Sequence, residues 1–390
     1  MKLKDKEKRI SIDIGSKNIK ALFSEYDPQK DELSIRKELS LTSHGLRYGY
    51  IQDEELVLQS LFKLMEKAEK IGEKIEEATF SIGGIGLNSK MIKVGISFPE
   101  KQEIEERDLN RVLEKAERLF AKKYPNQKIL HIIPNQFEID KREILGSPLT
   151  MFGLELGVKV LFITIPEHHY ESLYRVIDRS GIIINDIIAG PLAESLAVAD
   201  YTQKMQGCAV LNIGSETSSL VTFENGIISS CSVEKMGSND ITNDLALGLQ
   251  ISLREAEAVK LGKNKNYPQK KVHEIIAARN GEIITFIKKQ LKSLKKYKLL
   301  PAGIILTGGG SRLPFMEESV KKIALLPAEL VSIEKWNPKT KRKTDIGAEY
   351  SVAYGLSFER GDLRTKKHRK KFSFKKIKKK ILLLLEQLKP

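Results

Sequence analysis

The chain has 390 residues, of which 41% are hydrophobic and 30% charged, and its formal net charge is +15. This composition is typical of a globular protein rather than a disordered one, and the length allows two or three domains. No apolar run approaches the roughly 20 residues needed to cross a bilayer, and the charged N-terminus shows no secretory signal. Cys208 and Cys231 lie in or beside apolar runs without metal-ligand spacing, which predicts buried thiols in a reducing cytoplasm.

One pattern occurs twice in the chain. Residues 11–23 read SIDIGSKNIKALF and residues 210–223 read VLNIGSETSSLVTF, each with two apolar runs joined by Ile-Gly-Ser and a short polar loop. The pattern predicts two β-hairpins whose tight turns leave backbone N–H groups free to bind an anion. One copy alone would most simply be an ordinary turn. Two copies predict a pair of duplicated lobes that hold a polyphosphate between them.

After the first hairpin, the apolar spacing predicts alternating strands and helices as far as the second copy. The expected elements are a strand over 33–41, a helix over 53–75, strands over 78–85 and 90–98, a helix over 105–122, strands over 128–139 and 155–165, a helix over 168–180, a strand over 182–188 and a helix over 191–198. The series contains one strand–helix–strand–strand block, over residues 90–165, whose order of elements differs from that of the sequence around it. It is therefore predicted to be a small domain inserted into the first lobe.

The second lobe is predicted to open at residue 206 with the second hairpin. Its further expected elements are helices over 237–247 and 253–261, one long helix or a pair of helices over 268–297, a buried strand over 304–306, a glycine loop over 308–311 and a closing helix of small residues over 345–355. Strands that alternate with helices in both halves predict mixed α/β lobes.

The C-terminal tail has its own composition. Residues 361–390 contain twelve Lys and Arg but only two acidic residues, so the tail carries +10 of the net charge. Residues 361–371 are predicted to be a flexible basic linker, and the apolar residues that follow lie on one stripe of a helix whose polar side is rich in lysine. The predicted membrane-binding residues are Phe372, Phe374, Ile377, Lys378, Ile381, Leu384, Leu385 and Leu388.

A basic amphipathic helix of this kind lies in the interface of an anionic membrane. The alternatives are a solvated charge run and a nucleic-acid-binding tail. Nucleic acid is not expected as a partner, because such binding needs no ordered apolar stripe and the body shows no ladder of stacking aromatic residues.

The order of the glycine-containing loops resembles the superfamily of actin, Hsp70 and the sugar kinases, in which ATP lies between two duplicated lobes. The order is a hairpin at 13–17 (DIGSK), a helix that opens after a strand at 190–193 (GPLA), a second hairpin at 212–217 (NIGSET), a glycine loop at 307–311 (TGGGS) and the closing helix over 345–355. Within that superfamily the chain is similar to the FtsA family of bacterial cell-division proteins over about residues 8–358. The closer similarity is carried by HGLRYGYIQD at 44–53, ILHIIPNQFEID at 129–140, SPLTMFGLELGVKVLFIT at 147–164 and AEAVKLGKN at 256–264.

This resemblance implies an α/β fold of the actin-like ATPase type, with two duplicated lobes around a nucleotide cleft and an inserted subdomain called 1C. The implied divisions are 1–83 and 167–205 for subdomain 1A, 84–166 for 1C, 206–240 and 301–360 for 2A with the closing helix, 241–300 for 2B, 361–371 for the linker and 372–390 for the membrane-targeting helix.

The resemblance also implies a site for ATP and magnesium. The residues expected to bind nucleotide are Gly15, Ser16, Lys17, Gly214, Ser215, Glu216 and Thr217 at the phosphates, Gly237 near them, Glu257 and Lys260 at the ribose and adenine, and Gly308, Gly309, Gly310 and Ser311 at the adenosine. Asp13 would reach the magnesium ion through water. Without the resemblance, Glu257 and Lys260 would most simply be a surface ion pair one helical turn apart.

Four positions depart from the superfamily pattern, and two of them, Ser215 and Glu216, replace small glycines. Asn212 stands where an aspartate usually opens the second hairpin, and an amide brings no charge to a magnesium-bound water. Gly190 stands where many members have Glu or Gln to orient the attacking water, which glycine cannot do. Glu216 places a negative charge near the γ-phosphate unless its side chain turns away. We therefore expect ATP binding with slow or negligible hydrolysis, and at most a weak ATPase.

The FtsA resemblance implies an adaptor that sits peripherally on the cytoplasmic side of the cell membrane and tethers the tubulin-like protein FtsZ. It also implies self-association into actin-like filaments, with the partner surface at about residues 241–300. One alternative is a PilM-like pilus-assembly protein, which opens with a similar DIGS loop but needs no lipid-binding tail. A second alternative is a small-molecule kinase of the same superfamily, for which the sequence offers no aspartate base in a matching motif.

Overall fold

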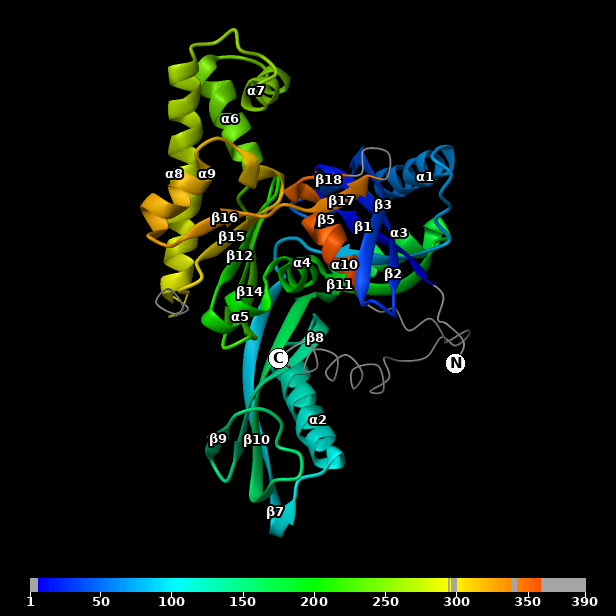
Figure 1. The fold of residues 1–390 in the computed structure, drawn as a ribbon, viewed down its shortest axis with the longest axis vertical. Helices are drawn as coiled ribbons and strands as arrows, with labels where there is room; N and C mark the ends of the chain where they lie inside the picture. The colour runs from blue at the N-terminus through cyan, green and yellow to red at the C-terminus, as the bar shows by residue number, and fades with distance from the viewer. Residues whose placement is uncertain (1–5, 294, 296–299, 338–341, 359–390) are drawn as a thin grey trace.

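The computed structural model describes residues 6–293, 295, 300–337 and 342–358. Figure 1 shows two lobes side by side, with an elongated block extending below them. The predicted linker over 361–371 and membrane helix over 372–390 lie outside the described residues. Within the described ranges, no helix is long and apolar enough to cross a membrane.

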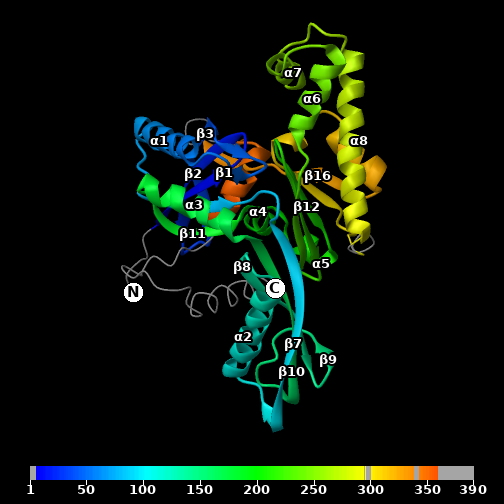
Figure 2. The same ribbon diagram turned by 180° about the vertical axis from the view of Figure 1, so that it is seen from behind.

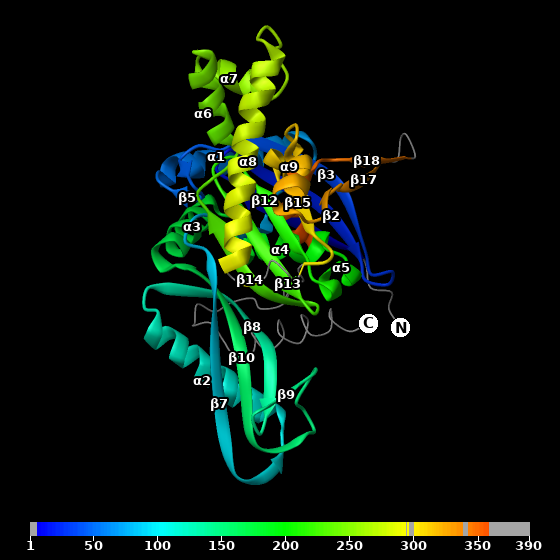
Figure 3. The same ribbon diagram turned by 90° about the vertical axis from the view of Figure 1, so that its left-hand side faces the viewer.

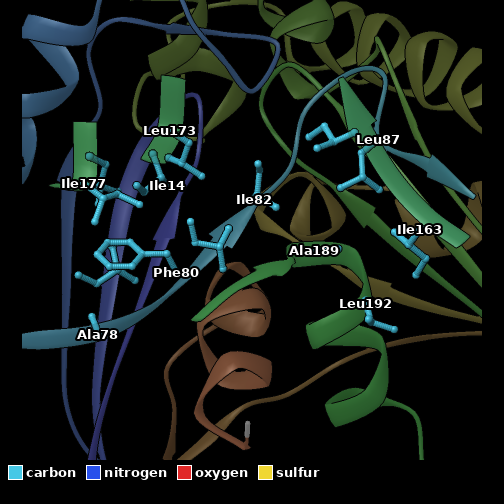
Figure 4. Close-up of a cluster of buried hydrophobic side chains, with 14 of the residues drawn as sticks. Ile14, Ala78, Phe80, Ile82, Leu87, Ile163, Leu173, Ile177, Ala189 and Leu192 are labelled. Atoms are coloured by element: carbon cyan, nitrogen blue, oxygen red, sulfur yellow. The ribbon is translucent and has the colours of Figure 1, made fainter. Parts of the chain in front are cut away.

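The first lobe is built on a five-stranded sheet of order β11-β6-β1-β2-β3. Its elements are β1 (Glu7–Ile14), β2 (Asn18–Asp27), β3 (Glu32–Thr42), β4 (Leu46–Arg47), β5 (Tyr50–Ile51), α1 (Glu54–Lys70), β6 (Glu77–Ile82), α3 (Glu167–Ser180), β11 (Ile183–Ala189), α4 (Gly190–Val198) and α10 (Ser351–Phe358). Helices α1 and α3 cover one face of this sheet and α10 the other, as Figures 1 and 2 show from opposite sides. Figure 4 shows Phe80 of β6 and Ile14 of β1 packed against Leu173 and Ile177 of α3.

The second lobe contains β12 (Ala209–Ile213), β13 (Ser218–Glu224), β14 (Ile227–Glu234), β15 (Ile304–Thr307) and β16 (Ala328–Leu330). Its helices are α5 (Tyr201–Gln206), α6 (Ser238–Leu249), α7 (Leu253–Lys260), α8 (Gln269–Ser293) and the short α9 (Met316–Ser319). The C-terminal half of α8 packs on the sheet through Ile283, Ile287 and Leu291, and Figure 3 shows this helix lying along the strands. The N-terminal half of α8 forms a separate small core with α6 and α7.

The inserted block consists of β7 (Asn88–Glu103), α2 (Glu106–Lys123), β8 (Gln127–Ile139), β9 (Arg142–Ile144) and β10 (Phe152–Pro166). The stacked rings of Phe120 and Phe162 lie in its core, with centroids 4.6 Å apart. By chain order the block lies between β6 and α3 of the first lobe. Its strands nevertheless continue the sheet of the second lobe, because Asn88 of β7 pairs with Ser232 of β14. The combined sheet has nine strands in the order β16-β15-β12-β13-β14-β7-β10-β8-β9.

The predicted duplication of the hairpins is confirmed. Strands β1 and β2 pair antiparallel up to Ile14 and Ile19, and β12 and β13 pair antiparallel up to Ile213 and Ser218. Each hairpin continues into a third antiparallel strand, and each first strand also has a parallel neighbour, β6 in one lobe and β15 in the other. Both turns therefore lie at the same edge of their sheets.

Two predicted helix boundaries are wrong. The closing helix does not begin at Asp345: that residue ends β18 (Arg342–Asp345), which pairs with β17 (Glu334–Asn337), and α10 begins only at Ser351. The Asp345 carboxylate accepts from the Gly347 amide at 2.9 Å, and Gly347 has a φ of +101°, so the chain turns there instead of continuing helical. The helix predicted over 53–75 ends at Lys70, because Gly72 has a φ of +76°. The subdomain boundaries stay predictions.

Candidate functional site

A cavity of about 540 Å³ lies between the two lobes. Both hairpin turns, the glycine loop after β15 and the facing sides of α4 and α7 line it. A volume of this size is typical of a small-molecule or cofactor site. The predicted site residues that line it are Asp13, Gly15, Ser16, Lys17, Gly214, Ser215, Thr217, Glu257, Lys260, Gly308, Gly309 and Gly310.

The two hairpin turns are closed by the same backbone hydrogen bond. The Gly15 amide donates to the Asn18 carbonyl at 3.1 Å, and the Gly214 amide donates to the Thr217 carbonyl at 2.9 Å. A Cβ atom at Gly15 or Gly214 would lie 3.0 or 2.8 Å from that same carbonyl oxygen. The turns therefore need glycine for the close approach of backbone to backbone.

Asp13 is a fixed carboxylate on the first-lobe side of the cavity. Its Oδ1 accepts from the Ser81 hydroxyl at 2.8 Å, and Lys20 Nζ lies 3.4 Å from its Oδ2. Carboxylate oxygens are the ligands that magnesium prefers, and Mg²⁺ usually keeps several of its waters. Asp13 is thus a donor of the kind that fits a magnesium ion, and no group of three or more metal-ligating side chains occurs among the described residues. The ligand role of Asp13 stays a prediction.

Lys17 reaches across the cavity from the first lobe to Glu257 on α7 of the second, where the two form an ion pair. Glu257 also accepts from Lys260 and Thr242, each at 2.7 Å. Burial by itself would raise the pKa of Glu257, but the hydrogen bonds from Lys17, Lys260 and Thr242 outweigh it and bring that pKa to about 2. Glu257 and Lys260 are therefore not a surface ion pair, since only 2% of the Lys260 side chain is exposed.

The glycine loop after β15 lies directly against the second hairpin. Gly308 has a φ of +80°, and a Cβ there would lie 2.4 Å from Asn212 Oδ1. A Cβ at Gly310 would lie 2.6 Å from Ile213 Cγ2. Gly309, in contrast, would meet nothing nearer than 3.8 Å. The loop is thus packed on one side and open toward the cavity on the other, which leaves room for a flat ligand against its backbone.

Three predicted residues support the cavity without lining it. Glu216 turns away from the cavity and accepts a hydrogen bond from the Tyr48 amide of the first lobe. Gly237 lies so close to the second turn that a Cβ would be 2.5 Å from the Ser215 carbonyl. The Ser311 hydroxyl donates to the Gly308 carbonyl at 2.6 Å. The nucleotide-binding roles of all these residues stay predictions.

Glu194 is the chief residue of the cavity that the sequence analysis did not single out. It lies one helical turn after Gly190 on α4, is 1% exposed, and accepts from Asn212 at 2.7 Å, Ser351 at 2.8 Å and Thr307 at 3.1 Å. Burial raises the pKa of Glu194 to about 7, although these hydrogen bonds partly oppose the shift. A single carboxylate within the small and apolar run GPLAESLAVA was the signal that could have identified it.

Two family models match this chain. One, described as the SHS2 domain inserted in FTSA, matches residues 84–164, and the other, described as cell division protein FtsA, matches residues 209–355. The first match coincides with the inserted block. Together the two models cover more than half of the sequence.

Several curated relatives are cell division protein FtsA of other bacteria. The Bacillus subtilis protein is 30% identical over 338 residues, which cover 80% of this chain and 76% of the relative. The Neisseria meningitidis protein is 29% identical over 91% of this chain and 90% of its own length. The Pseudomonas aeruginosa protein is 26% identical over 82% of each chain.

Solved structures with a similar fold include the PilM–PilN type IV pilus biogenesis complex, with a TM-score of 0.65, 18% identity and coverage of 90% of this chain and 97% of that one. MreB5 of Spiroplasma citri bound to ADP has a TM-score of 0.50, 14% identity and coverage of 90% and 94%. These likenesses concern the fold, and they confirm the predicted actin-like ATPase fold. On the sequence matches, this chain belongs to the FtsA family of cell division proteins.

Proposed function

We propose that this chain is an ATP-binding, actin-like adaptor that assembles on the cytoplasmic face of the cell membrane and tethers FtsZ to it. The observation that carries the nucleotide part is the pair of glycine turns that line one cavity from opposite lobes. Family membership supports the roles in division, self-assembly and FtsZ binding.

The cavity suits a nucleoside triphosphate with magnesium. The turns at Gly15 and Gly214 would hold the phosphates, and Lys17 would exchange its contact with Glu257 for the negative charge of the ligand. The Gly308–Gly310 loop would take the adenosine against its open side. A bound magnesium ion would neutralise phosphate charge. ATP would then act as a structural ligand that favours the closed arrangement of the lobes.

Turnover is expected to be slow. Gly190 brings no side chain that could orient a water, and the Asn212 amide is already engaged by Glu194. The four carboxylates that line the cavity all have partners: Asp13 has Ser81, Glu194 has four donors, Glu257 has Lys260 and Thr242, and Glu349 has Arg312. A general base must reach the proton it abstracts, and each of these carboxylates is already hydrogen-bonded or ion-paired within the protein.

Membrane attachment is assigned to the predicted helix over 372–390, through its apolar stripe and its lysines. The FtsZ-binding surface is assigned to the outer, exposed side of α6, α7 and the N-terminal half of α8. Leu247 and Leu253 are exposed there. Lys270 and Lys271 are exposed at the start of α8, and their charge suits an acidic peptide.

Liposome co-sedimentation tests the membrane part. Full-length protein, a truncation without residues 372–390, and a variant with Leu384→Asp and Leu385→Asp would each be spun with anionic vesicles, with and without ATP. We expect only the full-length protein to pellet, and ATP to increase its bound fraction. Sedimentation of the double variant would show that charge alone suffices. Equal behaviour of full-length protein and truncation would contradict the adaptor proposal and favour a pilus-type protein.

Recruitment of FtsZ is the second arm of this test. Purified FtsZ added to the same vesicles should pellet with the full-length protein and remain in the supernatant with the truncation. The matched control is vesicles with FtsZ alone. FtsZ that stays in the supernatant while the full-length protein pellets would remove the tethering role and leave membrane binding intact.

A further inference from the structure

Among the buried carboxylates of the described residues, Glu194 accepts the most side-chain hydrogen bonds. It lies outside the two hairpin turns at Gly15 and Gly214. Three donors converge on its Oε2: the Asn212 amide at 2.7 Å, the Ser351 hydroxyl at 2.8 Å and the Thr307 hydroxyl at 3.1 Å. Ser219 adds a longer contact to Oε1 at 3.4 Å. These donors come from β12, α10, β15 and β13, so one side chain of α4 joins four other elements. A buried charge persists only where such partners compensate it.

Each of the three close donors leads to the glycine loop. Thr307 is the residue immediately before Gly308. Asn212 packs against Gly308, since its Oδ1 would be 2.4 Å from a Cβ built there. Ser351 begins α10, and the short helical turn just before it presents the Ala348 carbonyl, which accepts from the Gly308 amide at 3.0 Å. Glu194 therefore holds the three parts of the structure on which Gly308 rests.

The orientation of Asn212 depends on Glu194 as well. An amide can present either its oxygen or its nitrogen in a given direction, and the two atoms differ only in what they can bond. Oε2 of Glu194 accepts from Asn212, Ser351 and Thr307, so any proton of the carboxyl group lies on Oε1, and Oε2 fixes the Asn212 nitrogen toward α4. The oxygen is then directed at Gly308. With the amide reversed, its nitrogen would face Gly308 and two acceptors would face each other at 2.7 Å.

We propose that Glu194 is the positioning residue of the glycine loop, and that from α4 it holds Gly308–Gly310 in the form that receives the adenosine of a nucleotide. This inference rests on the proposed nucleotide site, to which it adds a residue of the cavity wall that acts through the glycine loop. The phosphate turns at Gly15 and Gly214 close through their own backbone hydrogen bonds, in which Glu194 takes no part. The inference therefore separates the adenosine half of the site from the phosphate half.

Hydrogen exchange and binding on the full chain test this separation. The variants are Glu194→Ala, which removes all four contacts, and Thr307→Val, which keeps the side-chain shape but removes one donor. Ser195→Ala is the matched control, because Ser195 is equally buried on α4 but bonds only to Leu192 of its own helix, at 2.9 Å. The binding probes are ATP, adenosine and inorganic tripolyphosphate, measured by calorimetry.

We expect Glu194→Ala to speed amide exchange in residues 308–311 and to weaken ATP and adenosine about tenfold or more, as the loss of charged hydrogen bonds implies. Tripolyphosphate affinity should change by less than about threefold, which also shows that the variant is folded. Thr307→Val should give a smaller effect of the same kind, and Ser195→Ala none.

Unchanged exchange at residues 308–311 in Glu194→Ala and Thr307→Val would overturn the inference. So would an equal loss of tripolyphosphate and ATP in Thr307→Val. If instead the wild-type chain binds neither ATP nor tripolyphosphate, the proposed function fails, while the exchange data still decide whether Glu194 holds the loop.

Discussion

The hairpin β1–β2 and the hairpin β12–β13 have the same backbone and different charges. Both turns close with one glycine hydrogen bond, of 3.1 Å in the first and 2.9 Å in the second. The residue before the last one in each first strand is polar, Asp13 in β1 and Asn212 in β12. The parallel neighbour of each strand supplies a hydroxyl, Ser81 to Asp13 and Thr307 to Glu194. The carboxylate that accepts from this hydroxyl lies on the strand in the first lobe, as Asp13, and on helix α4 in the second, as Glu194.

The third residue of each turn shows the same relation. Lys17 and Glu216 hold equivalent places two residues after the turn glycine, and each reaches into the opposite lobe. Lys17 pairs with Glu257 on α7, and Glu216 accepts from the Tyr48 amide between β4 and β5. The duplication therefore preserves the direction of these side chains and reverses their charge. The sequence repeat predicts the backbone of the two turns but not the charges of their side chains.

The largest effect on stability is expected from Asn212→Asp, which gives the second hairpin the aspartate that the first hairpin has at Asp13. The substitution puts a carboxylate oxygen where the Asn212 amide nitrogen now lies, 2.7 Å from Glu194 Oε2. At low pH one proton can be shared between the two groups, but at pH 8.5 both would ionise, which would lower the free energy of unfolding by about 3 kcal/mol. Urea unfolding at pH 6 and pH 8.5 measures this difference. Glu194→Gln added to the variant should restore most of the stability, and a double variant no more stable than the single one would refute the pairing.

A slightly smaller effect on the free energy of unfolding is expected from Glu194→Gln alone, which removes the titratable carboxyl group of α4. Burial raises the pKa of Glu194 to about 7, so the folded chain holds this proton more tightly than the unfolded one. The stability it contributes is complete below the ordinary pKa of about 4.5 and is lost as the pH rises through about 7. Between pH 5 and pH 8 the wild type should therefore lose on the order of 2 to 3 kcal/mol relative to Glu194→Gln.

The other charged or titratable groups near Glu194 should not mask this trend. Asp13 also raises the pKa of Glu194, and burial raises the pKa of Cys231 to about 12, so that thiol stays protonated throughout the range. Parallel pH curves for the wild type and Glu194→Gln would contradict the prediction.

A moderate effect, equal in both hairpins, is expected from the turn glycines. Gly15→Ala and Gly214→Ala each force a methyl group to within 3.0 or 2.8 Å of a backbone carbonyl, which costs about 1 to 3 kcal/mol. Both variants should lower the melting temperature and weaken tripolyphosphate by similar factors. Loss in only one of them would show that the two turns are not equivalent as phosphate sites. Gly262→Ala provides a control at an exposed glycine with nothing within 4 Å, although its φ of +68° adds a local strain of its own.

The smallest effect is expected from the two crossing residues. Lys17→Met and Glu216→Gln each remove one contact between the lobes that is partly exposed, which is worth about 1 kcal/mol or less. They should differ in binding, because only Lys17 lines the cavity. Lys17→Met should weaken tripolyphosphate in calorimetry, whereas Glu216→Gln should leave it nearly unchanged. A stronger loss from Glu216→Gln than from Lys17→Met would place Glu216 at the phosphates after all.

The elements that the sequence predicted are those defined by local pattern. The two hairpins, the glycine loop and the long strands of the inserted block follow from alternation, glycine and turn residues within a few positions of one another. Glu194 escaped prediction because its partners Asn212, Thr307 and Ser351 are 18, 113 and 157 residues away. The closing helix was misplaced because residues 342–345 pair with a strand that is too short to show alternation. Contacts that only the tertiary fold creates leave no local trace in the sequence.

Strand β7 has a mechanical consequence. It runs without interruption from Asn88, beside β14 of the second lobe, to Glu103 at the far end of the inserted block. Sixteen residues of strand are about 50 Å long. A rotation of about 5° at Asn88 would therefore displace Glu103 by about 4 Å, which is more than a hydrogen bond tolerates. Any contact made at the tip of this block will thus depend on the angle between the lobes, as the end of a lever depends on its pivot.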